Sequence, residues 1–147
     1  MKIVLCGGYS FAEPFILQHP DDTLIWIDPD PVHCGHIRTI YEIETLCADP
    51  LSPGALELAQ VEGCDLLVAL LPCERDNLTL CQRAMERFHV RATIALARDD
   101  YQGAVLREYG VSEVLLAPRI LADSLTCAIA RTMARAECAC EQGETLE

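Results

Sequence analysis

Lysine is almost absent from this chain, and basic residues as a whole are scarce. Lys2 is the one lysine, and the 11 lysines and arginines are outnumbered by 23 aspartates and glutamates, which gives a formal net charge of −12. A surface this negative repels phosphate backbones, so nucleic-acid binding driven by charge is excluded. The scarcity of lysine also argues against Schiff-base chemistry.

Apolar runs long enough to cross a bilayer are also missing, so we expect no direct membrane insertion. No signal peptide is recognisable, because Met1-Lys2 leads straight into the first apolar run. The nine cysteines are many for 147 residues, but most lie inside apolar runs, where cysteine acts as a small hydrophobe. These are Cys6, Cys47, Cys64, Cys81 and Cys127. We therefore predict a cytoplasmic protein with reduced thiols.

Catalytic motifs are lacking too. The sequence contains no G-x-S-x-G nucleophile turn, and no histidine apart from His33 is placed where it could act as a base at a predicted crevice. We therefore expect that the chain is not an enzyme. A small NAD-dependent oxidoreductase stays a minor alternative, although a substrate domain and a proton donor are not recognisable.

What the sequence does have is a regular alternation of apolar strands and amphipathic helices. Strands are predicted at residues 2–6, 23–27, 45–48, 64–71, 91–97 and 113–117. Helices are predicted at residues 10–18, 31–43, 53–62, 74–89, 100–109 and 118–136, the first with a capping box of Ser10 and Glu13. Short connections and this order predict an α/β fold, a Rossmann-like, doubly wound, six-stranded parallel sheet in a single three-layer domain. Residues 1–136 would form that domain, and the acidic residues 137–147 a flexible tail.

The opening stretch, residues 1–30, is typical of the βαβ unit that binds mononucleotides, with both strands ending at one crevice. Asp28 follows the second strand, where a carboxylate can accept both ribose hydroxyls of an adenosine and disfavours a 2′-phosphate. Asp30 strengthens that exclusion. The alternative is that these aspartates only form an Asp-Pro-Asp-Pro turn.

The glycine loop after the first strand departs from G-x-G-x-x-G. With Gly8 in the middle position, Cys6 and Phe11 replace the outer glycines; with Gly7 in the first position, Tyr9 takes the middle one. A tyrosine there would block a pyrophosphate. The alternative reading is a strand–helix turn that needs glycine only for its backbone.

Other residues are expected at the same crevice because they end neighbouring strands. They are Asp49, Leu71, Pro72, Arg98, Pro118 and Arg119. Arg98 could pair with a phosphate or, alternatively, with Asp99 or Asp100. Metal sites are weakly supported at two places, namely His33, Cys34 and His36 with Asp30, and Cys138 with Cys140.

Several segments together resemble the TrkA N-terminal domain family, also called RCK or KTN. They are MKIVLCGG, IDPD, CADPLSPGALELAQVEGCDLLVAL, ERDN, ALARDDY and LLAPRILADSLTCAIAR, which span residues 1–131. The resemblance implies a domain that regulates potassium channels and transporters, binds NAD(H), ATP or ADP, and pairs as a homodimer through its last helices. It would place Asp28 and Asp30 at the ribose, Asp49 on the adenine side, and Arg98 on the arginine-bearing segment.

Two functional hypotheses follow. In the first, the chain is a cytoplasmic ligand-sensing dimer, peripheral to the inner membrane through a transporter partner, with Gly7, Gly8, Tyr9, Asp28, Asp30, Asp49, Leu71 and Arg98 at its nucleotide site. In the second, the chain is a degenerate Rossmann scaffold or dimerisation module without nucleotide binding. That second hypothesis predicts a crevice filled by Tyr9 or Phe11.

Overall fold

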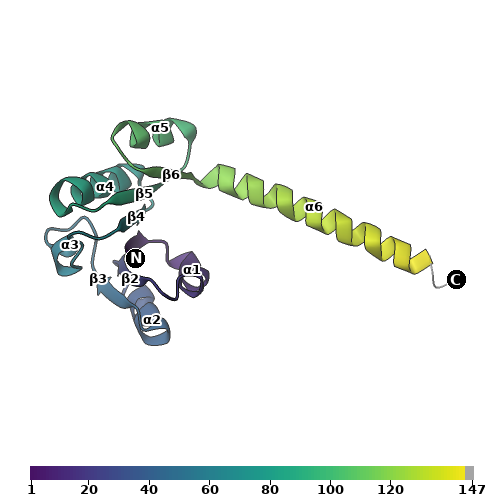
Figure 1. Ribbon diagram of the computed structural model, residues 1–147, viewed down its shortest axis with the longest axis horizontal. Coiled ribbons are helices and arrows are strands. Elements are labelled where there is room, and N and C mark those ends of the chain that lie inside the picture. Colours follow the sequence, from purple (N-terminus) through teal and green to yellow (C-terminus); the bar gives the residue numbers. More distant parts are fainter. Residues whose placement is uncertain (145–147) are drawn as a thin grey trace.

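The six apolar runs form one parallel sheet, as predicted, in a computed structural model that describes residues 1–144 (Figure 1). The strands are β1 (Lys2–Gly7), β2 (Thr23–Asp28), β3 (Glu44–Cys47), β4 (Leu66–Leu70), β5 (Ala92–Ala97) and β6 (Glu113–Leu116). The helices are α1 (Ala12–Gln18), α2 (Pro31–Tyr41), α3 (Ala55–Leu58), α4 (Glu74–Phe88), α5 (Asp100–Glu108) and α6 (Ala117–Glu144), with a 3₁₀ turn, η1 (Tyr9–Phe11), before α1. The predicted fold class is confirmed.

The strand order is β3-β2-β1-β4-β5-β6, so the direction of winding reverses between β1 and β4. Val4 of β1 registers with Ile25 on one side and with Leu67 on the other. The central strands read as continuous apolar runs because helices lie on both faces of the sheet. The reversal point leaves a crevice beyond the carboxyl ends of β1 and β4, which is where ligands bind in open α/β sheets.

One face of the sheet, here called the covered face, is packed by helices along its whole width. Val4, Ile25, Leu67, Ala95 and Val114 supply one buried residue from each of five strands. The residues packed over them come from α3, α4 and α5, and include Leu56, Leu80, Cys81, Ala84, Phe88 and Leu106. This face therefore forms a complete core from the chain's own residues.

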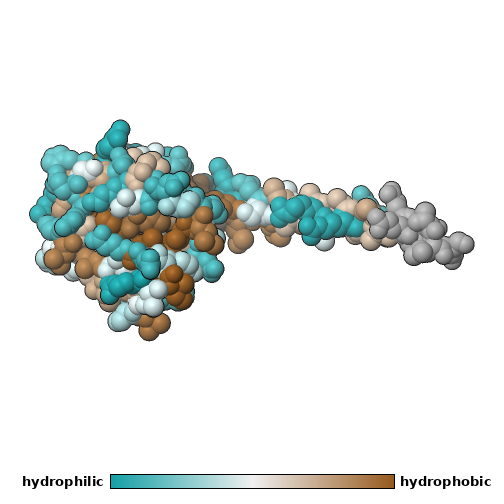
Figure 2. Space-filling view, turned by 60° about the horizontal axis from the view of Figure 1, so that its bottom comes forward, coloured by the Kyte–Doolittle hydropathy of each residue, from teal (hydrophilic) through white to brown (hydrophobic). Residues whose placement is uncertain are grey.

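The other face, here called the open face, is covered over only part of its width. Helices α1 and α2 pack Ile16 and Ile37 against buried residues of β1 and β2 such as Leu5 and Trp26. An apolar groove of about 720 Å³ remains over β4, β5 and β6 and reaches Ile3 and Leu5 of β1. Its lining includes Phe11, Phe15, Leu66, Leu70, Ile94, Leu96, Leu115, Ile120 and Leu121. In Figure 2, hydrophobic residues extend across the domain to the base of α6.

Helix α6 projects away from the domain (Figure 1). All residues of positions 118–140 are exposed except the half-buried Ala128. We predicted a flexible tail from residue 137, but the helix continues to Glu144, since the Ala, Glu and Gln residues of this segment favour helix. Residues 145–147 of the predicted tail lie outside the described residues, and the division of the chain at residue 136 stays a prediction.

Two local predictions were wrong. The capping box of Ser10 and Glu13 does not form, because η1 places Phe11 at the N-cap of α1 with no side-chain hydrogen bond. The helix predicted at residues 53–62 is only the single turn α3, which Gly54 precedes with a left-handed backbone. Asp30 and Asp99 cap α2 and α5, and each accepts a hydrogen bond from a backbone N–H in the first turn.

The cysteines divide differently from the prediction. Cys6, Cys64 and Cys81 are buried as expected, whereas Cys47 and Cys127 are exposed and Cys34 is buried instead. Burial raises the pKa of the Cys81 thiol to about 12, and raises the pKa of Cys6 and Cys64 as well. Within the described residues, no helix is both long and apolar enough to cross a membrane.

Candidate functional site

The glycine loop at the end of β1 is a tight left-handed turn. Gly7 and Gly8 have φ angles of 83° and 77°, a region that favours glycine. A Cβ on Gly7 would lie 2.9 Å from the carbonyl oxygen of Leu70 on β4, which leaves no room for a side chain. A Cβ on Gly8 would lie 2.5 Å from the Phe11 ring, so Phe11 covers the second glycine.

Asp28 ends β2 and is 5% exposed, which is unusual for a carboxylate. Its Oδ1 atom accepts a hydrogen bond from the backbone N–H of Asp30 at 2.8 Å. Both of its carboxylate oxygens lie 3.2 Å from Nδ1 of His33, in the first turn of α2. The acceptor atoms that a ribose would need are therefore present at the predicted place, and His33 occupies them.

Tyr9 and His33 close the crevice beside Asp28. The two rings stack with their centroids 3.8 Å apart and their planes 5° from parallel. The Tyr9 hydroxyl also lies 2.9 Å from Nδ1 of His36, one helical turn further along α2. We call Tyr9 and His33 the aromatic plug. Tyr9 thus turns toward α2 and binds side chains from another element.

His33 is the residue that reasoning from sequence underestimated. It was considered as a base and, with Cys34 and His36, as a metal ligand. In the structure His33 bonds Asp28 and His36 bonds Tyr9, and the described residues contain no group of three or more His, Cys, Asp or Glu that could hold a metal ion. The usable signal was the spacing, because a residue three positions after the helix cap Asp30 faces back over the strand end.

Asp30 caps α2 and flanks the plug. Its Oδ1 atom accepts from the N–H of Val32 at 2.8 Å, and its Oδ2 atom lies 3.6 Å from Nε2 of His33. His33 therefore lies between the carboxylates of Asp28 and Asp30. A carboxylate pair facing one imidazole can hold that ring in place, and it can accept hydroxyl groups when the ring leaves.

The remaining predicted residues lie around the rim. Asp49 is exposed, and its carboxylate accepts from the N–H of Leu51 at 2.9 Å. Leu71 is held through its backbone, because the amide of the buried Asn77 bonds both its N–H and its C=O, at 2.8 and 3.0 Å. The same amide donates to the C=O of Leu96 at 3.1 Å, so Asn77 ties the end of β4 to that of β5.

Arg98 does not form the predicted ion pair with Asp99 or Asp100. Its Nη2 atom donates to the C=O of Pro72 at 2.7 Å, and its Nε atom lies 3.5 Å from the carboxylate of Glu74. The predicted ion pair with Asp99 or Asp100 is replaced by this pair with Glu74. Arg119 instead lies 3.9 Å from Asp100.

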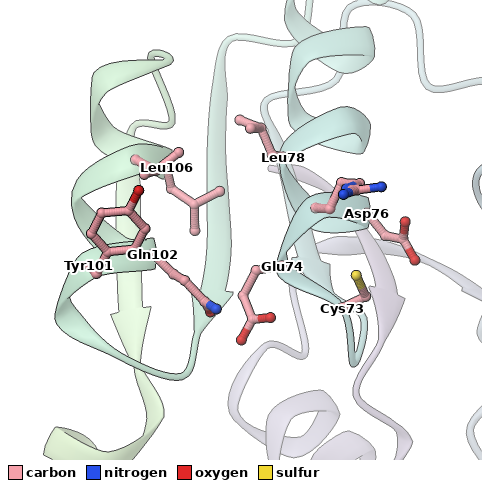
Figure 3. Close-up of a pocket in the computed structure, with 9 residues that line it drawn as sticks. Cys73, Glu74, Asp76, Leu78, Tyr101, Gln102 and Leu106 are labelled. Carbon is pink, nitrogen blue, oxygen red and sulfur yellow. The ribbon is translucent and has the colours of Figure 1, made fainter.

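A cavity of about 670 Å³ lies beside this rim, between α4 and α5 (Figure 3). Glu74 from α4 and Gln102 from α5 face each other across it. Its lining residues include Cys73, Asp76, Leu78, Tyr101 and Leu106, and none of the glycine-loop or plug residues. This cavity is therefore separate from the crevice at Asp28.

These features define the class of protein: a Rossmann-like α/β domain whose β1 loop and β2 carboxylate meet at the reversal of strand order. The chain belongs to the TrkA-N domain family, whose profile matches residues 3–117. The resemblance noted from the sequence segments is therefore confirmed. No curated protein sequence matches the chain significantly.

Solved structures with this fold include the TrkA-N domain of the inner membrane protein ybaL from Escherichia coli. It is 19% identical, with a TM-score of 0.75, and the match covers 85% of this chain and 93% of that one. The NAD(P)-binding domain of an exopolyphosphatase-related protein from Archaeoglobus fulgidus is 14% identical, with a TM-score of 0.72 and coverage of 88% and 97%. The GsuK channel bound to NAD is 19% identical, with a TM-score of 0.69, and the match covers 82% of this chain but only 22% of GsuK.

Proposed function

We propose that this chain is a cytoplasmic regulatory domain that binds an adenine nucleotide, NAD(H), ATP or ADP, and acts as a homodimer on a membrane ion channel or transporter. The observation that carries the proposal is the buried Asp28 carboxylate at the end of β2, beside the Gly7-Gly8 turn of β1. Membership of the TrkA-N family supports the regulatory role. GsuK structures with NAD and with ADP support the choice of ligands.

Ligand binding requires the aromatic plug to open. His33 holds both oxygens of Asp28 at 3.2 Å, and the two ribose hydroxyls of a nucleotide would take over these acceptors. Tyr9 would leave its stack on His33 and uncover the Gly7-Gly8 turn. The free and bound states thus differ at the first turn of α2, and a ligand shifts their populations by its differential affinity for the two.

The homodimer is proposed from two apolar surfaces that no part of the chain covers, one on α6 and one on the open face of the sheet. Leu121, Leu125, Ile129 and Met133 recur every four residues along α6, and each is at least 55% exposed. The apolar groove over β4, β5 and β6 begins where α6 leaves the domain, and Leu121 lines it.

We propose that α6 of a second copy fills the groove, and that the exchange is mutual. A helix of 28 residues is long enough, at about 1.5 Å per residue, to reach across a neighbouring domain. A symmetric pair would cover both grooves and both apolar stripes in one interface. Any change in the crevice could then reach a transport protein through the arrangement of the two copies.

A thermal-shift titration with NAD, NADH, ATP, ADP and AMP, under reducing conditions, tests nucleotide binding. A ligand at about a hundred times its dissociation constant stabilises the fold by about 2.7 kcal/mol. We expect a shift with at least one nucleotide that Asp28→Asn removes. The exposed Asp21→Asn is the matched control and should keep the shift. No shift with any of the five would contradict nucleotide binding.

The second candidate function is a scaffold or dimerisation module that binds no nucleotide. It is favoured by the plug itself and by the Phe11 ring over Gly8. The two candidates share the dimer and differ only in the crevice. A dimer that binds none of the five nucleotides would select the scaffold.

A further inference from the structure

Two thiols lie together beside Asp28, at the ends of β2 and β3. Cys47 ends β3 and registers with Asp28 on β2, and Cys34 lies in the first turns of α2. The Sγ atom of Cys34 lies 3.2 Å from the C=O of Asp28 and 3.9 Å from that of Leu46. The Sγ atom of Cys47 lies 3.7 Å from the C=O of Pro29. The carbonyl groups of Asp28 and Pro29 belong to consecutive residues, so the two thiols lie at the same strand ends.

The two thiols differ in their access to solvent. Cys34 is 2% exposed, whereas Cys47 is exposed. Burial, the neighbouring Cys47 side chain and the nearby Asp28 carboxylate raise the pKa of Cys34 to about 11. Cys47 can therefore react with a reagent from solution, whereas the buried Cys34 can react only with a group already bonded to the Cys47 sulfur. This is the division of roles between an attacking thiol and a resolving thiol.

We propose that Cys34 and Cys47 are a modification site at which a reversible intrachain disulfide forms by exchange with a low-molecular-weight disulfide. The Cys47 thiolate attacks one sulfur of the small disulfide, a mixed disulfide forms, and the other half leaves as a thiolate that takes a proton from water. Cys34 then loses its proton to water and attacks the Cys47 sulfur. The mixed bond breaks, and the second half leaves as a thiol. Two protein thiols are oxidised while one small disulfide is reduced to two thiols.

The bond would join the start of α2 to the end of β3, with Asp28 between them. His33, which holds the Asp28 carboxylate, directly precedes Cys34 in the chain. The disulfide would thus hold the aromatic plug closed. This consequence for ligand binding rests on the proposed function, whereas formation of the bond does not.

To test this, the full chain is equilibrated in buffers that contain different ratios of reduced to oxidised dithiothreitol. Free thiols are then blocked with N-ethylmaleimide under denaturing conditions, and disulfide-linked peptides are identified by mass spectrometry. We expect a Cys34–Cys47 link whose fraction follows the buffer ratio and returns to zero on reduction. The exposed Cys73 and Cys127 should remain alkylated at every ratio. Both Cys34 and Cys47 alkylated at the most oxidising ratio, or linked to other cysteines, would overturn the proposal.

Two serine variants sharpen the test. Cys47→Ser changes an exposed position, so the fold should be kept, and Cys34 should then stay alkylated at every ratio. Cys73→Ser, at another exposed position, should keep the Cys34–Cys47 link. If the link forms but oxidised and reduced protein bind nucleotides equally, the disulfide does not hold the plug closed. If neither form binds nucleotides, the proposed function fails. In both cases the disulfide site itself stands.

Discussion

The two halves of the sheet are finished in different ways. In the half made by β1, β2 and β3, helices cover both faces and the side chains of Tyr9 and His33 fill the strand ends. In the half made by β4, β5 and β6, the covered face is complete, but the open face carries an apolar groove and α6 points outward. In the first half, the chain's own side chains cover the sheet and fill the strand ends. In the second half, an exposed apolar surface of the kind that binds other molecules remains.

The largest difference between the two halves is expected in the stability lost when a leucine on the open face is truncated to alanine. Leu24 on β2 is buried and does not line the groove, so Leu24→Ala should lower the free energy of unfolding by about 2–5 kcal/mol at any protein concentration. Leu96 on β5 lines the groove, so Leu96→Ala should cost stability mainly at concentrations where the dimer forms. Denaturant titrations at low and high protein concentration check this. If the stability losses of the two variants depended on protein concentration in the same way, the two halves would not differ as described.

The proposed dimer should break when a charge enters the apolar stripe of α6. Leu125→Glu should raise the dimer dissociation constant by about a hundredfold, or about 2.7 kcal/mol, because a carboxylate would be buried without a partner. Ala134→Glu places the same charge on the opposite side of the helix and should leave the dimer intact. Analytical ultracentrifugation of the wild type and both variants measures this. A monomeric wild type would contradict the homodimer.

The smallest effect concerns a contact that joins the halves. The backbone N–H of Lys2 and the Arg91 guanidinium bond the Asp65 carboxylate at 2.9 and 3.0 Å, and they hold its pKa below its usual range. A depressed pKa contributes stability that is present above the unfolded pKa of about 3.9 and is lost as pH falls through the folded pKa.

Asp65→Asn should therefore lower stability slightly at pH 7 and lose its effect below about pH 4. Chemical denaturation across this pH range, with the exposed Asp21→Asn as control, checks the sign. A difference from the wild type that grows toward low pH would contradict this assignment.

The sequence predicted most of the features that depend on local chemistry. The strands were recognisable as short apolar runs, because a strand buried between helices is apolar on both of its faces. The family resemblance was also visible in short segments. Ser10 shows the limit of this approach, because packing of Phe11 over Gly8 changed the start of α1.

Features that depend on tertiary placement were not predictable. The stack of Tyr9 on His33 joins residues from two elements, and no spacing in the sequence brings them together. The uncovered face of β5 could not be recognised from the sequence either. Ile94 and Leu96 are apolar, as they would be in a strand that helices cover on both faces. The closeness of Cys34 and Cys47 likewise depends on the packing of α2 against β3.

The most direct test of the closed ribose site is the nucleotide dissociation constant of the wild type and three variants, measured by isothermal titration calorimetry under reducing conditions. His33→Ala should bind roughly fivefold tighter than the wild type, because about 1 kcal/mol of competition for Asp28 is removed. Asp28→Asn should not bind. Thr39→Ala, on the exposed side of α2, should match the wild type. Equal affinity in all the variants, or weaker binding by His33→Ala, would contradict the claim that His33 keeps the ribose site closed.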